Sequence, residues 1–252
     1  MTAQPPLPAI RRGHGHPILF LHGFALAPAT YERTVDLLAQ QARVIAPMWL
    51  YTDGEWSYEV ALEALEATLT AADVSQVTLI GHSFGGGLAL GLAARRPEWI
   101  ERLVLVDTLG CSDGRQMARN AVPGRHLARL ASLAATRDFF ATILTRPRDV
   151  QRAAMWGYRY AMDAEIETVG ALDLPKQVVW SETDALLPMV DGQRFAERLR
   201  ASFHVVPIVD GTTPTDHDWA YRRPRLFVRT LVEVGALPES RIAPTGSRFV
   251  RW

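Results

Sequence analysis

The hydrophobic positions of this chain fall into two recurring patterns, which are short continuous runs and longer stretches with helical spacing. The short runs are rich in Val, Ile and Leu, as in strands that are buried on both faces of a parallel sheet. They cover residues 17–21, 43–47, 77–80, 102–106, 177–180 and 203–208. Stretches with apolar residues three or four positions apart predict helices over 30–41, 58–71, 191–199 and 224–234 and from residue 85 onward. Residues before 13 predict at most one edge strand. The alternation predicts an α/β fold, with a mostly parallel central sheet covered by helices on both faces.

The stretch from residue 110 to 174 contains no run that predicts a strand. A connection of this length is rarely a plain loop, and its apolar spacing predicts several short helices that form a cap. We therefore expect a first core part (1–109), a helical cap (110–174), a second core part (175–237) and a C-terminal tail (238–252). One cluster in the cap either lines an apolar pocket or fixes the cap to the core: Met155, Trp156, Tyr158, Tyr160 and Met162.

The stretch at residues 76–90, QVTLIGHSFGGGLAL, passes from a predicted strand into a predicted helix. The turn between them is Gly-His-Ser-Phe-Gly, the pattern of a nucleophile elbow, in which the serine has a strained backbone conformation. The residues two before and two after the serine must be very small, and Gly81 and Gly85 meet this demand. The start of the helix also directs free N–H groups to the place where negative charge would develop. We predict that Ser83 is a nucleophile.

A serine hydroxyl needs a base to take its proton, and the base needs a carboxylate to fix its tautomer. Asp184 follows the predicted strand 177–180, and His217 follows the predicted strand 203–208. Because the carboxyl ends of parallel strands meet at one edge of a sheet, both side chains are expected near Ser83. Asp107 ends the strand 102–106 at the same edge and is the alternative acid. We assign two other histidines, at positions 22 and 82, to the structural frame of the turns.

These motifs resemble those of α/β-hydrolase fold enzymes with a helical cap. The resemblance rests on HGF at 22–24, GHSFGG at 81–86, LVLVD at 103–107 and the loops that contain Asp184 and His217. It implies that Ser83 is the nucleophile, that His217 is the general base and acid, and that Asp184 orients the histidine. It also implies an oxyanion hole made by the backbone N–H groups of Phe24 and Phe84. The family often has glycine at position 181 and Gly-His at 216–217, where this chain has Ser and Asp-His.

The expected activity is cofactor-independent hydrolysis of a small or medium apolar carboxylic ester through an acyl-enzyme. A carbon-carbon bond hydrolase of the meta-cleavage type is the first alternative, and lactonases, thioesterases and perhydrolases use the same three residues. That alternative needs a cation for a dienoate carboxylate, and Arg152 and Arg159 are candidates. Dehalogenases and epoxide hydrolases use an aspartate where this chain has Ser83. A ligand-binding protein on this fold is the alternative from another class, and the complete Ser, Asp and His set argues against it.

The composition supports a single α/β domain without special partners. The chain has 252 residues, of which 48% are hydrophobic, and its formal net charge is zero. Neutral charge does not favour nucleic acid or an anionic membrane as a partner. A single cysteine excludes an internal disulfide, and no apolar run approaches the length of a membrane span. We expect a cytoplasmic protein that acts on a small molecule without a metal or a cofactor; the sequence leaves open whether it forms a homo-oligomer.

Overall fold

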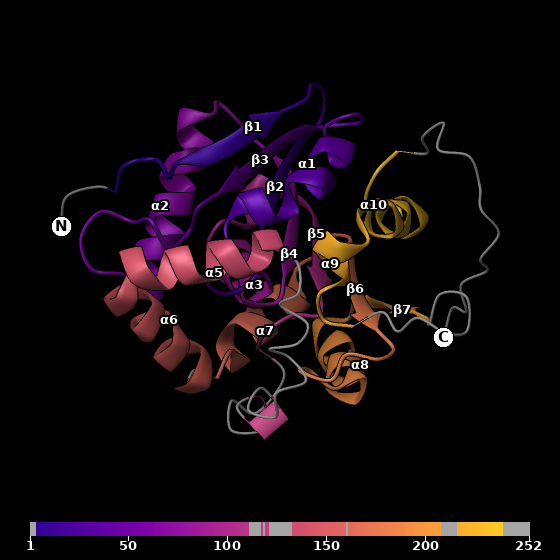
Figure 1. Cartoon of the computed structure of the whole chain (residues 1–252). Coiled ribbons are helices and arrows are strands. Elements are labelled where there is room, and N and C mark those ends of the chain that lie inside the picture. The colour runs from indigo at the N-terminus through magenta and orange to yellow at the C-terminus, as the bar shows by residue number, and fades with distance from the viewer. Residues whose placement is uncertain are drawn as a thin grey trace.

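The computed structural model of the chain describes residues 4–110, 117, 119–120, 133–159, 161–207 and 216–238. These residues include a seven-stranded sheet with the order β1-β3-β2-β4-β5-β6-β7 (Figure 1). Its strands are β1 (Ala9–Arg12), β2 (Pro17–Leu21), β3 (Arg43–Pro47), β4 (Val77–His82), β5 (Ile100–Val106), β6 (Lys176–Ser181) and β7 (Ser202–Val206). All neighbouring strands are parallel except β1, which pairs antiparallel with β3 at the edge. The predicted α/β fold with a mostly parallel sheet is confirmed.

Helices cover both faces of this sheet. The described helices are η1 (Pro28–Tyr31), α1 (Glu32–Leu38), α2 (Tyr58–Ala71), α3 (Phe84–Arg95), η2 (Pro97–Trp99), α5 (Leu133–Thr145), α6 (Pro147–Arg159), α7 (Asp163–Ala171), α8 (Met189–Leu199), α9 (Trp219–Arg222) and α10 (Pro224–Glu233). Because side chains of a strand alternate between its faces, Ile18 and Phe20 of β2 pack with α1 and α10. Leu19 and Leu21 of the same strand pack with α2, α3 and α8 on the other face. Burial on both faces explains why the strands are continuously apolar.

The observed elements differ from the predicted ones mainly at their ends. Helix α2 has the predicted bounds, and the Oγ atom of Ser57 accepts a hydrogen bond from the N–H of Val60 at its start. The helix expected over 30–41 is divided into η1 and α1, because Pro28 starts a tighter 3₁₀ turn. Strand β4 continues two residues beyond the predicted end, to His82. The short helix α9 was not predicted, since four residues are too few to show helical spacing.

Helices α5, α6 and α7 lie between β5 and β6 in the chain, where the sequence predicts the cap. Figure 1 shows α5 and α6 side by side, and the two helices are in contact. Helix α5 reaches the core through Asp138, whose Oδ2 atom accepts a hydrogen bond of 2.8 Å from Thr30 of η1. The cap boundaries stay a prediction, and residues 111–116, 118, 121–132 and 160 lie outside the described residues, as do residues 239–252 of the tail predicted over 238–252.

The sheet register determines which loops meet. Leu21 at the end of β2 pairs with Gly81, and His82 at the end of β4 pairs with Val106 at the end of β5. Val106 in turn pairs with Val179 of β6. The loops that follow β2, β4, β5 and β6 therefore leave one edge of the sheet close together.

None of the helices in the described ranges is long and apolar enough to cross a bilayer.

Candidate active site

Ser83 occupies the turn between β4 and α3, in a backbone conformation that is rare for a residue other than glycine. Its φ is 55° and its ψ is −121°. The turn is tight enough that a Cβ atom on Gly81 would lie 2.6 Å from the carbonyl oxygen of Gly85. A Cβ atom on Gly85 would lie 2.3 Å from the carbonyl oxygen of Leu21. Both glycines are thus required by backbone atoms, which cannot move aside as a flexible side chain can.

The three side chains predicted as nucleophile, base and acid form one hydrogen-bonded chain. The Nε2 atom of His217 lies 2.8 Å from Oγ of Ser83, and its Nδ1 atom lies 2.7 Å from Oδ2 of Asp184. The three residues are buried, with relative exposures of 7–8%. Because a carboxylate only accepts, Nδ1 must carry a proton, and in the neutral ring the lone pair of Nε2 then accepts the hydroxyl hydrogen of Ser83. This is the tautomer that a general base requires.

The charges in this chain favour an ionised Asp184 beside His217. Burial lowers the pKa of His217, but the facing carboxylate of Asp184, followed by the charges of Asp107 and Asp218, outweighs this effect and raises the pKa above its ordinary value. Burial opposes ionisation of Asp184, and His217 together with the N–H groups of Leu186 and Leu187 lowers the pKa of the carboxyl group overall. Those two N–H groups donate to Oδ1 at 2.8 and 2.9 Å. One oxygen of Asp184 is therefore held by the backbone, and the other faces the imidazole.

Asp107, the alternative acid, lies at the same edge but has other partners. Its Oδ1 atom accepts a hydrogen bond from the N–H of Ser181 at 2.7 Å, and its Oδ2 atom accepts one from Nε1 of Trp219 at 2.6 Å. Complete burial, followed by the nearby charge of Asp184, raises the pKa of Asp107. Of the two candidate acids, Asp184 is therefore the one that makes the hydrogen bond to His217.

The two residues predicted to form an oxyanion hole lie beside Ser83. Phe84 is the first residue of α3, where backbone N–H groups lack partners within the helix. The loop with Phe24 passes close to the serine, since a Cβ atom on Gly23 would lie 3.6 Å from Cβ of Ser83. The rings of Phe24 and Phe84 are also neighbours, with centroids 5.6 Å apart. Their assignment as oxyanion donors stays a prediction.

The aromatic and methionine residues of the predicted cap have different surroundings. Trp156 of α6 lies against Phe84, with ring centroids 5.2 Å apart, and stacks on Tyr58 at 4.3 Å. Met162 is buried, whereas Met155 and Tyr158 are 38% and 41% exposed. Tyr160 lies outside the described residues. Trp156 and Met162 therefore connect this segment to the core beside the elbow, and the cluster as a whole does not form one buried wall.

The two candidate cations of the predicted cap lie on the surface. Arg152 forms ion pairs with Glu55 at 2.6 Å and with Asp149 at 3.5 Å, and its side chain is 37% exposed. Arg159, at the end of α6, is exposed. Both observations fit solvated arginines.

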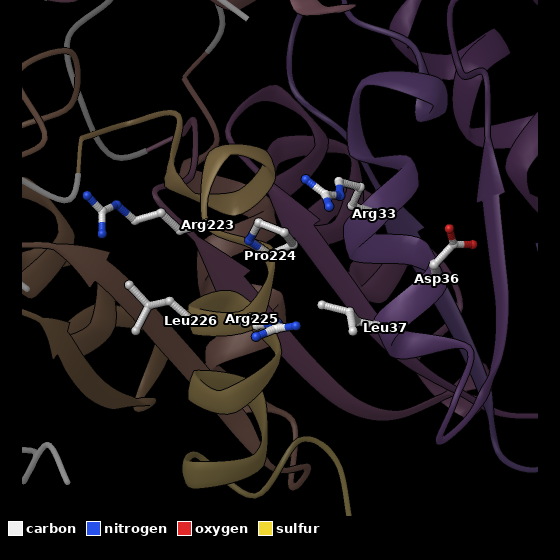
Figure 2. Close-up of a pocket in the computed structure, with 7 residues that line it drawn as sticks. All are labelled: Arg33, Asp36, Leu37, Arg223, Pro224, Arg225 and Leu226. Carbon is white, nitrogen blue, oxygen red and sulfur yellow. The ribbon is translucent and has the colours of Figure 1, made fainter. Parts of the chain in front are cut away.

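A groove lies between α1 and α10, away from Ser83, His217 and Asp184 (Figure 2). It has a volume of about 540 Å³ and is lined by Arg33, Asp36, Leu37, Arg223, Pro224, Arg225 and Leu226. In Figure 2 the side chain of Arg223 extends away from Arg33, so the guanidinium groups do not converge on one point. The groove contains none of the predicted catalytic residues.

Comparisons with known proteins agree with this fold. A model of the α/β-hydrolase fold family matches residues 16–211. The chain belongs to this family. It is 37% identical over 110 residues to a 2-hydroxymuconate semialdehyde hydrolase of Pseudomonas sp. strain CF600, and the match covers 40% of this chain and 39% of that protein. The chain thus spans about two fifths of the length of the first curated relatives that it matches.

Solved structures resemble this α/β-hydrolase over most of its length. An esterase from Thermogutta terrifontis has a TM-score of 0.68 and 21% identity, and the match covers 90% of this chain and 93% of the esterase. A bromoperoxidase from Bacillus anthracis has a TM-score of 0.69 and 15% identity, with 90% and 94% of the two chains covered. At these identities the likeness concerns the fold.

Within the described residues of this α/β-hydrolase, no group of three His, Cys, Asp or Glu side chains could hold a metal ion.

Two residues with contacts in this site were not predicted from the sequence. Trp219 donates to Asp107, and the hydroxyl group of Tyr31 lies 2.8 Å from Nδ1 of His82. Tyr31 fits the helical spacing of its segment, which indicates a buried face but no specific partner. Only the tertiary structure brings it to His82, which is 51 positions away in the chain.

Proposed function

We propose that this α/β-hydrolase cleaves a small or medium apolar carboxylic ester through an acyl-enzyme, without a metal or a cofactor. The observation that carries the proposal is the buried hydrogen-bonded chain from Asp184 through His217 to Ser83. The strained conformation of Ser83 supports it, because such strain is typical of a nucleophile elbow. The family to which the chain belongs supports the same class of reaction.

In the proposed reaction, the hydroxyl oxygen of Ser83 attacks the ester carbonyl while its proton passes to Nε2 of His217. The N–H groups of Phe24 and Phe84 hold the negative charge that develops on the carbonyl oxygen. The imidazolium then protonates the leaving alcohol, and the acyl-enzyme forms. Next, His217 deprotonates a water molecule, which attacks the acyl carbonyl. Collapse of the second intermediate releases the acid, and the proton returns to Ser83.

The surroundings of Ser83 favour an apolar acyl group. Phe24 and Phe84 are its aromatic neighbours, and Trp156 extends this aromatic surface into the segment that we propose as the cap. An uncharged acyl chain would bury apolar area here, at about 25 cal/mol per Å². The proposal includes residues 110–174 as a helical cap over the site and a small molecule as the substrate.

Hydrolysis of a carbon-carbon bond is the second candidate function. The similarity to a 2-hydroxymuconate semialdehyde hydrolase favours it, although that match covers only 40% of the chain. Such a substrate carries a carboxylate that needs a cationic partner, and Arg152 is already engaged by Glu55 and Asp149. A lactone or a thioester would use the same three residues and needs no such cation.

The test compares wild type, Ser83→Ala and the matched control Ser202→Ala, whose serine lies exposed at the start of β7. Each is incubated with a fluorophosphonate probe and with p-nitrophenyl esters from acetate to decanoate. We expect labelling and ester cleavage by wild type and by the control. Loss of Ser83 should lower turnover by at least about 10⁴-fold, because such residues act as a unit. Labelling without ester cleavage, together with turnover of 2-hydroxymuconate semialdehyde, would favour the second candidate. If wild type neither labels nor cleaves, the hydrolase proposal is wrong.

A further inference from the structure

His82 connects three of the four loops that carry the proposed catalytic groups: the loop of Phe24, its own turn with Ser83, and the loop of His217. It is fully buried and directly precedes Ser83. Its Nε2 atom lies 2.9 Å from the backbone carbonyl oxygen of His217, and its Nδ1 atom lies 2.8 Å from the hydroxyl oxygen of Tyr31. That hydroxyl oxygen also accepts a hydrogen bond of 3.1 Å from the N–H of Gly23, the neighbour of Phe24.

The partners of His82 allow only one arrangement of protons. A carbonyl oxygen cannot donate, so Nε2 of His82 must carry the hydrogen, and Nδ1 must then accept from Tyr31. The tyrosine has donated its single proton and can therefore accept from Gly23. Burial lowers the pKa of the His82 imidazole to about 3, so the ring stays neutral at ordinary pH and this direction is maintained. Burial also raises the pKa of Tyr31, which keeps its proton.

Each end of this series of hydrogen bonds holds a backbone group close to the proposed catalytic residues: the N–H of Gly23 at one end and the carbonyl of His217 at the other. Gly23 carries the loop of the proposed oxyanion donor Phe24, and the His217 carbonyl belongs to the residue of the proposed base. The fit is close, since a Cβ atom on Gly23 would lie 3.1 Å from the Tyr31 hydroxyl and 3.5 Å from Nδ1 of His82. None of these hydrogen bonds involves the Oγ atom of Ser83. They can therefore fix the positions of the two loops without taking part in the reaction.

We propose that Tyr31 and His82 are positioning residues that fix the oxyanion loop and the loop of the base in one register about Ser83. This inference rests on the proposed function. Loss of the Tyr31 hydroxyl would leave the N–H of Gly23 without this partner and would free the oxyanion loop to shift. Misplaced oxyanion donors weaken binding of the transition state more than binding of the substrate, so the rate of the chemical step should fall with little change in KM.

Tyr31→Phe is the main variant, and Tyr58→Phe is its matched control. Tyr58 is also buried and donates a hydrogen bond of 3.3 Å to a backbone carbonyl, that of Gly87. Both variants keep the ring and lose one hydroxyl group. We expect Tyr31→Phe to lower kcat and the rate of fluorophosphonate labelling about 10-fold to 100-fold, less than full removal of a donor would. KM should stay within about 2-fold. Tyr58→Phe should leave both rates unchanged, even where its melting temperature falls.

Two further variants divide the functions of His82. A glutamine amide can reach the position of Nε2, so His82→Gln keeps a donor for the His217 carbonyl and loses the Tyr31 contact. An asparagine amide reaches only the position of Nδ1, so His82→Asn keeps the Tyr31 contact and loses the His217 carbonyl. In His82→Gln the Tyr31 hydroxyl can still accept from the N–H of Gly23 but is no longer held by His82, so adding Tyr31→Phe should cost less than it does in wild type. His82→Asn combined with Tyr31→Phe should cost more than either change alone.

A readout that does not depend on activity separates this inference from the proposed function. Nitrogen-15 NMR of histidine-labelled protein should show His82 as the neutral Nε2–H tautomer at pH 7, and Tyr31→Phe should shift its Nδ1 resonance. If this tautomer is observed and wild type cleaves no ester, the proposed function is wrong, and the hydrogen bonds through His82 and Tyr31 have no ester hydrolysis to support. If wild type is active and Tyr31→Phe matches Tyr58→Phe in kcat, the two residues only support the fold and the positioning proposal is overturned.

Discussion

Replacing Asp184 by asparagine keeps the shape of the side chain and reverses the direction of its hydrogen bond to His217. The backbone N–H groups of Leu186 and Leu187 both donate to Oδ1, at 2.8 and 2.9 Å. An asparagine must keep its carbonyl oxygen there, because its amino group would otherwise face two donors. The amino group then takes the place of Oδ2, 2.7 Å from Nδ1 of His217.

This orientation would block the proposed base. Facing a donor, Nδ1 of His217 must accept, so the proton moves to Nε2, which can no longer take the hydrogen of Ser83. A wrong tautomer at this position costs about 10⁴-fold in kcat, or about 5.5 kcal/mol of transition-state stabilisation. We expect Asp184→Asn to lose kcat by about this factor while the protein remains folded.

Asp107→Asn is the matched control, because Asp107 is equally buried and belongs to the same edge. Both of its oxygens accept hydrogen bonds, so an amide would place a donor against the N–H of Ser181 or against Trp219. The expected cost is about 1–3 kcal/mol of unfolding free energy, with kcat within about 10-fold of wild type. Ester turnover and urea unfolding are measured for both variants. A folded Asp107→Asn protein without turnover, beside an active Asp184→Asn protein, would refute the assignment of the acid.

Three further predictions concern pH and packing. Burial lowers the pKa of His217, but Asp184 raises it overall, so kcat/KM should increase with pH through a midpoint above 6.5, and a pH profile of Asp184→Asn should place the midpoint lower. Burial lowers the pKa of His22 to about 4, below its unfolded value. As the pH falls from 6.5 to 4, this histidine should therefore lower the unfolding free energy by about 1.4 kcal/mol per pH unit. Urea unfolding measured across this range should show a smaller dependence of the unfolding free energy on pH for His22→Gln than for wild type. Gly85→Ala places a Cβ atom 2.3 Å from a backbone carbonyl oxygen of β2, so it should prevent folding or strongly lower the melting temperature. Gly87→Ala is the control, because the nearest contact of its Cβ atom is a methionine sulfur at 3.4 Å. It should keep the melting temperature and the ester turnover of wild type.

The sheet could be predicted from sequence because strands buried on both faces leave continuous apolar runs. Such runs gave β2 and β3 their observed bounds. Helix ends are harder to predict, because they depend on local backbone turns such as the 3₁₀ turn that begins at Pro28. Helix α9 is too short to give a periodic signal.

The proximity of Ser83, Asp184 and His217 could be predicted because each follows a strand at the same edge of a parallel sheet. The hydrogen bonds that hold these residues could not. The donors to Asp184 are backbone groups of Leu186 and Leu187, whose side chains carry no signal. The partners of His82 lie 51 and 135 positions away, so no local pattern distinguishes this histidine from an ordinary buried one.

Backbone strain is concentrated where the loops of this site begin. Ala25, Ser83 and Asp107 have positive φ values of 52°, 55° and 41°, and they follow β2, β4 and β5, which are neighbours in the sheet. Each such residue costs about 1–3 kcal/mol and persists only where its surroundings determine the conformation. The paired strand ends and the hydrogen bonds through His82 supply such surroundings. In the proposed reaction, the N–H groups of Phe24 and Phe84 would thus be held in place before a substrate arrives, and a preorganised donor needs no reorganisation when charge develops.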